Sequence, residues 1–158
     1  MPSPGLVRFI AWARAADGKL TLASQGNGSI GHLAGALLEL RAGIKMEHVA
    51  YRGGAESARD VAAGNIDGAI GTANSFAPII QNDRARGIAL TSGERRGSLA
   101  HLPTLAESGF PGFDLTSWNG LFAPSATPAP IRARLEAALR HATTDEPTRQ
   151  RLAQGSKR

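Results

Sequence analysis

Residues 19–92 alternate between short apolar stretches and longer stretches with the period of an amphipathic helix, separated by turns that contain glycine. The pattern predicts strands at 20–24, 46–51, 66–71 and 87–91, and helices at 30–41, 55–63 and 75–81. Parallel strands need a crossover connection, and a helix between successive strands supplies one. The segment is therefore predicted to be an α/β domain, a parallel-rich sheet flanked by helices with right-handed crossovers.

The sequence on either side of this segment has a different character. Residues 6–16 have a helical pattern that Gly18 ends, and two further amphipathic helices are predicted at 129–142 and 146–154. Residues 93–128 are rich in proline and glycine and contain a strand-like stretch at 113–122, which is typical of a crossing segment. These changes divide the chain into four predicted parts, 1–18, 19–92, 93–128 and 129–158.

The composition excludes several classes of function. The formal net charge is +5, most of it on helix-like sequence after residue 130, and aromatic residues make up 5% of the chain. A basic helical face with so few aromatic residues does not predict a nucleic-acid partner. The chain has no cysteine, which excludes disulfides, thiolate nucleophiles and cysteine–zinc sites. Its first residues lack the pattern of a secretion signal.

The candidate site lies at the ends of the predicted strands. Ligands of open parallel sheets bind beyond the carboxyl ends of the strands, and the residues there are small, polar and rich in hydroxyls and amides. The predicted ligand-binding residues are Ser24, Gly26, Asn27, Gly28, Ser29, His32, Tyr51, Arg52, Gly53, Gly71, Thr72, Asn74 and Thr91.

The turn after the first strand is the most informative of these ends. Gly26 and Gly28 leave backbone N–H groups open to close approach, and Ser29 adds a hydroxyl where the next helix begins. A helix N-terminus attracts anions, so this turn predicts an anion site, and Arg52 is placed to pair with a carboxylate. Glycines also serve tight strand–helix turns that bind nothing, and a solvated arginine is ordinary, so the residues alone leave both interpretations open.

No catalytic or metal-binding residues are predicted. The four histidines are scattered without metal-ligand spacing, and only His32 falls near a strand end. Asp67 lies within a strand, where a structural role is favoured over a catalytic one. The sequence therefore favours a binding protein without a cofactor over an enzyme. Three alternatives stay open: an α/β enzyme acting on a small phosphorylated or carboxylated substrate, a cytoplasmic ligand-sensing domain of similar fold, and a decayed remnant without activity.

The order of several motifs resembles the Bug family, the extracytoplasmic solute receptors of tripartite tricarboxylate transporters. The resemblance runs from about residue 6 to residue 154 and rests on the serial order of the motifs more than on any one of them. In this sequence the motifs are Ser24-Gln-Gly-Asn-Gly-Ser-Ile-Gly-His32, His48-Val-Ala-Tyr51-Arg-Gly, Gly64-Asn-Ile-Asp67, Leu90-Thr-Ser, Leu102-Pro-Thr-Leu-Ala-Glu107-Ser-Gly-Phe-Pro-Gly-Phe113, Ser117-Trp118-x-Gly120 and Ala123-Pro-x-x-Thr127-Pro128.

The resemblance implies a lobe of a two-lobed, type II periplasmic-binding fold that captures a small carboxylate without catalysis. It implies transporter subunits in the membrane as partners and a periplasmic location. It also implies that the first lobe and signal peptide of the family are missing here, so that the C-terminal helices return toward an absent lobe and ligand binding is weak. Many members have an acidic residue, suited to a ligand ammonium, where this chain has Gly71. A plain carboxylate is therefore expected rather than an amino acid.

The two C-terminal helices carry apolar side chains that would need cover in the absence of that lobe. Exposing one such side chain forgoes about 1.5–3 kcal/mol of burial, which is large beside a domain stability of about 5–15 kcal/mol. The expected outcomes are a mobile tail, a tail folded back on the second lobe, or a homodimer through these helices. The side chains concerned are Ile131, Leu135, Leu139 and Leu152.

Overall fold

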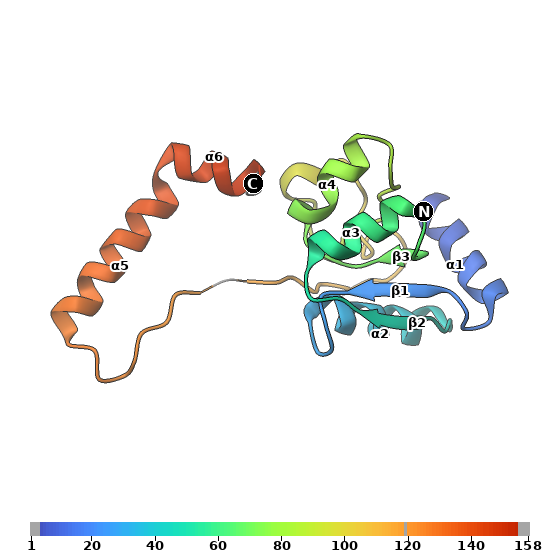
Figure 1. Cartoon of the computed structure of the whole chain (residues 1–158), viewed down its shortest axis with the longest axis horizontal. Helices are drawn as coiled ribbons and strands as arrows, with labels where there is room; N and C mark the ends of the chain where they lie inside the picture. The colour runs from blue at the N-terminus through green and yellow to red at the C-terminus, as the bar shows by residue number, and fades with distance from the viewer. Residues whose placement is uncertain (1–3, 119, 155–158) are drawn as a thin grey trace. The chain divides into compact units, whose positions relative to one another are not determined.

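A computed structural model describes residues 4–118 and 120–154 of the chain, which divide into two compact units, residues 1–116 and 117–158. The first unit contains a sheet and its covering helices, and the second contains two helices (Figure 1). In chain order the elements are α1 (Pro4–Ala16), β1 (Thr21–Ser24), α2 (Ile30–Ala42), β2 (Glu47–Ala50), α3 (Gly54–Ala63), β3 (Gly68–Ala69), α4 (Ala73–Gln81), the short 3₁₀ helix η1 (Gly97–Leu99), α5 (Ala129–Thr144) and α6 (Glu146–Gln154).

The sheet has three parallel strands in the order β2-β1-β3. The chain moves outward from β1 to β2 through α2, and then returns past β1 to β3 through α3. Because both crossovers are expected to be right-handed, the change of direction sends α2 and α3 to opposite faces of the sheet. Figure 1 shows this arrangement, with α2 on one side and α3 and α4 on the other. The predicted α/β fold with a parallel sheet flanked by helices is confirmed.

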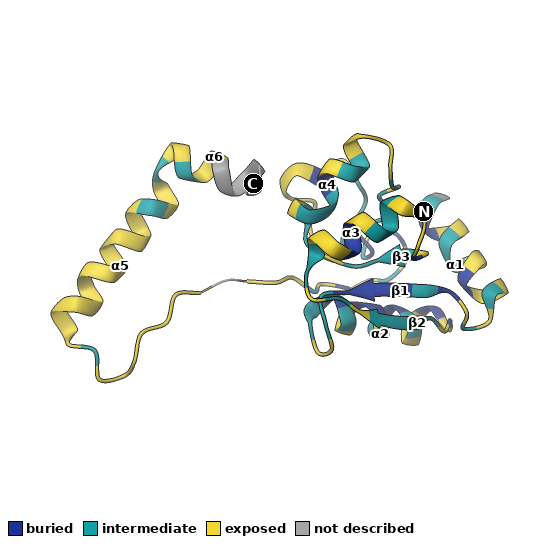
Figure 2. Cartoon of the chain, in the orientation of Figure 1, coloured by how far each residue is buried: buried dark blue, intermediate teal, exposed yellow. Residues whose placement is uncertain are grey.

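The hydrophobic core lies where α1 and α2 pack together on the sheet. It includes Leu6 and Ala13 of α1, Leu38 of α2, and Leu105 and Phe113 from the segment that follows the sheet (Figure 2). Phe113 is completely buried, so the segment around it is part of the first unit. That burial explains why a proline-rich stretch without regular structure stays in place: its apolar side chains fill the core.

Glycines bring α2 close to the strands. A Cβ at Gly35 would lie 2.9 Å from Cδ2 of Leu22, and one at Gly31 would lie 2.5 Å from the carbonyl oxygen of Ile70. Only glycine permits such a close approach of a helix to a neighbouring backbone. The N-terminal turn of α2 is therefore set directly against the end of β3.

Asp67 ties the beginnings of two strands together. Its Oδ2 accepts hydrogen bonds from the backbone N–H of Thr21 at 2.8 Å and from the Thr21 hydroxyl at 2.7 Å. In return, the Asp67 N–H donates to the Thr21 hydroxyl at 3.1 Å. The donated hydrogen bonds stabilise the charged carboxylate and lower the pKa of Asp67. The structural role favoured from the sequence agrees with these contacts.

Two predicted strands are wrong. Residues 87–91 form no strand of the sheet; Leu90 makes an isolated parallel bridge to Thr104 instead. Residues 113–118 and 120–122 are likewise irregular, although Leu115 exchanges hydrogen bonds with Thr91. Both stretches have apolar alternation, but a strand needs a neighbour to complete its ladder, and these stretches pair with each other and with loops rather than with β3.

The second unit shows an exposed amphipathic helix. No residue of α5 is buried, and Ile131, Leu135 and Leu139 are each exposed, as Figure 2 shows along the helix. The side chain of Leu152 lies outside the described residues. An ion pair between Glu136 and Arg140 spans one turn of the exposed surface. The apolar stripe predicted for this helix is present and uncovered.

Candidate functional site

Three helices begin at the same edge of the sheet. All three strands are parallel, so the loops that follow them lie at one edge, and α2, α3 and α4 each start there. Each helix leaves first-turn N–H groups without intrahelical acceptors and presents the positive end of its dipole. The loops after β1 and β3, which are neighbours, lead to helices on opposite faces, and ligands of open parallel sheets bind beside such a switch in direction.

The turn after β1 is held by hydrogen bonds among its own residues. The N–H of Gly26 donates to the Ser24 hydroxyl at 3.3 Å, and the N–H of Ser29 donates to the carbonyl of Gly26 at 3.2 Å. Ser29 caps α2 by accepting from the His32 N–H at 3.3 Å. Gly26 and Gly28 have φ of 114° and 75°, a region that favours glycine.

These bonds change which groups of the turn are free to bind a ligand. Ser24 is buried with its hydroxyl engaged, and the Gly28 N–H donates to Nδ1 of His32 at 3.0 Å. Asn27 is exposed, and its backbone N–H and side-chain amide have no partner among the described residues. The first-turn N–H groups of Ile30 and Gly31 are likewise without an acceptor there. The free donors of this turn are thus at Asn27 and at the start of α2.

Two histidines contact this turn through hydrogen bonds. The rings of His32 and His48 stack with centroids 3.9 Å apart and planes 12° from parallel. Nε2 of His48 lies 2.6 Å from the Ser24 hydroxyl oxygen. Burial lowers the pKa of His48, the adjacent His32 lowers it further, and Glu39 partly opposes both effects. His32, predicted to bind ligand, is here a neighbour of the backbone of the turn.

The loop after β2 supplies the exposed cation of the site. Arg52 is exposed and has no hydrogen bond or ion pair within the described part of the chain. Gly53 is the N-cap of α3 and contributes no side-chain cap, so the first-turn N–H groups of this helix are uncapped. The hydroxyl of Tyr51 is already engaged, because it donates to Oδ2 of Asp60 at 2.8 Å. That hydrogen bond, more than burial, raises the pKa of Tyr51.

The loop after β3 begins a second uncapped helix. Thr72 is the N-cap of α4, yet its hydroxyl lies 3.2 Å from that of Ser75 and makes no cap hydrogen bond. Asn74 is exposed in the first turn with no side-chain partner among the described residues. Gly71 is exposed, and a Cβ there would lie 2.5 Å from Cε2 of Phe76, so the Phe76 ring occupies the space that a side chain at this position would need. The position therefore offers an apolar surface rather than an acid.

Close packing at Gly54 brings the three loops together. A Cβ at Gly54 would lie 2.8 Å from Nε2 of Gln25 and 2.9 Å from Cβ of Ser75. Gln25 follows β1, Gly54 starts α3, and Ser75 is in the first turn of α4. The sequence-based set of site residues omits Gln25 and Ser75. Gln25 stands directly after a predicted strand, which is a signal that would have included it, whereas the place of Ser75 depends on the packing of two helices.

Thr91 stands apart from this cluster in its bonding. Its hydroxyl donates to the carbonyl of Leu115 at 2.8 Å, and its carbonyl accepts from the Leu115 N–H. Since 87–91 is not a strand of the sheet, the reason for placing Thr91 at the site is lost, and no hydrogen bond joins it to the three loops. Its role in ligand binding stays a prediction, as do the roles of the other predicted site residues.

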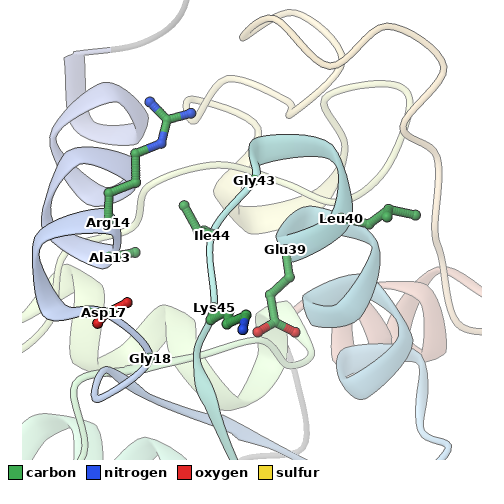
Figure 3. Close-up of a pocket in the computed structure, with 9 residues that line it drawn as sticks. All are labelled: Ala13, Arg14, Asp17, Gly18, Glu39, Leu40, Gly43, Ile44 and Lys45. Carbon is green, nitrogen blue, oxygen red and sulfur yellow. The ribbon is translucent and has the colours of Figure 1, made fainter.

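A concavity lies at the opposite edge of the sheet, where β1 and β2 begin. The pocket has a volume of about 490 Å³ (Figure 3). Its charged groups are of both signs, and two are engaged: Arg14 donates to the carbonyl of Ala42 at 2.7 Å, and Glu39 accepts from the Met46 N–H at 2.6 Å. The lining residues are Ala13, Arg14, Asp17, Gly18, Glu39, Leu40, Gly43, Ile44 and Lys45.

Within residues 4–118 and 120–154, no cluster of three or more acidic or histidine side chains is arranged to hold a metal ion. In the same residues, no helix combines the length and apolarity needed to cross a membrane. The hydrogen-bond donors described at the three loops include backbone N–H groups, the side-chain amides of Asn27 and Asn74, and the guanidinium of Arg52. Such donors recognise a negatively charged oxygen group.

Together, the parallel sheet with its change of direction and the helices on both of its faces have the architecture of a lobe of a periplasmic binding protein. Residues 1–156 match the family model described as "Tripartite tricarboxylate transporter family receptor". The chain belongs to this family, and the resemblance to the Bug receptors seen in the sequence is confirmed.

Comparisons with individual proteins agree. A UPF0065 protein of Pseudomonas sp. (strain P51) is 39% identical over 87% of this chain and 41% of its own length. Solved structures include R. palustris Rpa4515 with adipate, with TM-score 0.82, 29% identity, and coverage of 94% of this chain and 50% of that one. MatC from Rhodopseudomonas palustris with bound malate has TM-score 0.82 and 27% identity over 97% of this chain and 52% of that one. The periplasmic binding protein BugD has TM-score 0.84 and 26% identity over 98% of this chain and 52% of that one.

The chain therefore spans about half the length of the solved structures it matches. Activity, ligand and partners of the whole receptors are carried over to this chain only as proposals.

Proposed function

We propose that this chain is a receptor lobe that captures a small carboxylate in the periplasm for a tripartite tricarboxylate transporter. The observation that carries the proposal is the convergence of uncapped helix N-termini at one sheet edge, with Arg52 exposed and unpaired among the described residues. Backbone donors at helix N-termini bind carboxylates without further groups. Structures of relatives of this lobe with adipate and malate support a dicarboxylate as the class of ligand.

The proposal assigns no catalytic step to the site. The imidazoles nearest to it, His32 and His48, are hydrogen-bonded to Gly28 and Ser24 of the turn itself. A general base must be within reach of the proton that it removes from a substrate, and these rings are directed at the protein. Phe76 over Gly71 supports a ligand without an ammonium group, because no acidic side chain stands at that position.

Titration of the full chain with adipate and malate, followed by amide NMR, tests the proposal. One lobe encloses only part of a small ligand, so the expected affinity is weak, in the millimolar range. The amides of Asn27, Arg52 and Asn74 should shift together as ligand is added. Shifts confined to the pocket at the opposite edge, or no shifts at millimolar ligand, would contradict the proposal.

Substitution of Arg52 supplies a sharper test with a matched control. Arg52→Gln removes the exposed cation of the site, and Arg59→Gln makes the same change on the exposed surface of α3. A hydrogen bond to a charged group contributes about 1.5–3 kcal/mol, and an exposed site retains the lower part of that range. Arg52→Gln should weaken binding about tenfold, since about 1.4 kcal/mol is a factor of ten, and Arg59→Gln should leave binding unchanged.

The exposed face of α5 supports a separate proposal about partners. The helix has an exposed apolar stripe made of Ile131, Leu135 and Leu139. We propose that a second copy of this chain covers the stripe and forms a homodimer. Sedimentation over a range of concentrations tests for a homodimer. Replacing Leu135 by Gln should shift the equilibrium from dimer toward monomer. A wild-type chain that is monomeric at all concentrations would contradict the homodimer.

A further inference from the structure

Beside the turn after β1 lies a stacked pair of partly buried histidines, whose contacts the proposed ligand does not explain. His32 is on α2 and His48 is on β2, and their rings lie face to face with centroids 3.9 Å apart. Each ring has a hydrogen-bond contact with the turn after β1: His32 with the N–H of Gly28 and His48 with the hydroxyl of Ser24. The pair thus holds the turn at two points four residues apart.

The contact at Gly28 fixes the chemical form of His32. An N–H group donates, so Nδ1 of His32 must carry its lone pair, and the ring proton of the neutral imidazole is then on Nε2. Protonation of the ring adds a hydrogen at Nδ1, which would point at the Gly28 N–H. The bond between Gly28 and His32 therefore exists only while His32 is neutral.

The contact at Ser24 tolerates a proton. The Ser24 oxygen accepts from Gly26 and Ser29 and can donate its own hydrogen to the carbonyl of Gly26 at 3.1 Å. A hydroxyl oxygen has two lone pairs, so Nε2 of His48 can donate to Ser24 only in place of the Gly26 N–H or the Ser29 hydroxyl; protonated His48 fits the turn with the loss of one of those 3.3 Å contacts. The two rings differ in this respect: the turn accommodates a proton on His48 and rejects one on His32.

The closeness of the two rings disfavours a positive charge on both of them at once. Two imidazolium rings stacked at 3.9 Å would repel, and Glu39 is the acidic group whose charge acts on His48. Burial disfavours the charged form of His48 and lowers its pKa.

We propose that neutral His32, stacked on His48, positions the turn at 24–29, and that protonation of its Nδ1 releases Gly28 and loosens the turn. This inference rests on the proposed function, because that proposal assigns the free donors at Asn27 and at the start of α2 to the ligand, and the turn positions these donors. Acidification then changes the shape of the anion site through a residue that does not touch the ligand. The role of His32 is that of a positioning residue.

The test measures the turn itself and needs no ligand. Amide NMR of the full chain should find His32 as the Nε2–H tautomer at about pH 8 and a protected Gly28 amide. At about pH 5, below the usual pKa of histidine, the protection of Gly28 should fall about fivefold, as expected for the loss of one hydrogen bond. A His32 that carries its proton on Nδ1, or a Gly28 amide unchanged while both rings titrate, would overturn the proposal.

Three variants separate positioning from a general structural effect. His32→Asn keeps an acceptor near the place of Nδ1 without a titrating group, so Gly28 should stay protected at both pH values. His32→Ala should lose that protection at both. His101→Asn is the control, because His101 is exposed and has no ring contact or hydrogen bond among the described residues; it should behave as the wild type.

The outcome is distinguishable from that of the proposed function. If dicarboxylates fail to bind but Gly28 follows the protonation of His32, the proposed function fails and the positioning role stands. If dicarboxylates bind with an affinity that is independent of pH and Gly28 does not respond, the receptor function stands and the positioning role is overturned.

Discussion

Replacing Gly31 by alanine should separate helix propensity from the close packing that sets the N-terminus of α2. The added Cβ would lie 2.5 Å from the carbonyl oxygen of Ile70 and 3.4 Å from Cβ of Ser24. The Ile70 carbonyl has little freedom to move away, because the N–H of the same residue, on the preceding peptide group, anchors Ile70 to the carbonyl of Ala23 at 3.0 Å. Either α2 or the end of β3 must therefore shift.

Two opposing contributions determine the magnitude. Alanine favours a helix over glycine by about 0.8–1 kcal/mol, and overpacking a well-filled interior costs about 1–3 kcal/mol. The contact at Gly31 is with a fixed backbone atom, so the upper part of the overpacking range applies. The free energy of unfolding of Gly31→Ala should fall by about 1–2 kcal/mol.

Urea unfolding followed by far-ultraviolet circular dichroism measures this change. Gly35→Ala is the graded comparison, because its Cβ would lie 2.9 Å from Cδ2 of Leu22, the movable end of a side chain. Gly53→Ala is the control, because a Cβ there meets nothing within 4 Å and its φ of −169° suits any residue. A Gly31→Ala protein as stable as Gly53→Ala would refute the argument that backbone contact sets this helix.

Three further predictions concern stability. Asp67→Asn weakens the bonds to Thr21 that join the starts of β1 and β3; the free energy of unfolding in urea should fall by about 1 kcal/mol, the low end for bonds to an exposed charge. Tyr51→Phe removes the bond to Asp60 and should cost about 1 kcal/mol in the same assay, and an unchanged midpoint would show that the bond contributes nothing. Folding lowers the pKa of His48, so the unfolded chain takes up a proton at higher pH than the folded chain does. The contribution of neutral His48 to the free energy of unfolding should be fully present above pH 6.5, the usual pKa, and should decline as the pH falls below it. In urea unfolding at several pH values, His48→Gln should reduce this dependence of stability on pH.

The predictions from the sequence succeeded where a local pattern was sufficient. Ser29 caps α2 and Gly43 ends it in a left-handed conformation, as the sequence around each residue indicates. The strand–helix alternation also gave the parallel sheet, because parallel strands have few other ways to connect.

The predictions failed where the outcome depends on distant partners. Residues 87–91 alternate like a strand, yet periodicity does not show whether a neighbouring strand is free to pair. The ligand-binding role of Ser24 stays a prediction, but the sequence does not reveal that its hydroxyl lies 2.6 Å from Nε2 of His48, a residue brought near by the register of β1 and β2. The stacking of His32 on His48 joins two elements in a way that no spacing in the sequence reveals.

The main donors at the sheet edge belong to the peptide backbone at the starts of α2, α3 and α4. A substitution other than proline leaves a peptide N–H in place, so point mutation rarely deletes such a donor. Under the proposed function, side chains around the edge, such as Arg52, Asn74 and Phe76, can change without removing the backbone donors that attract a carboxylate. A lobe built in this way can diversify across ligands during evolution while its means of holding negative charge is inherited with the fold.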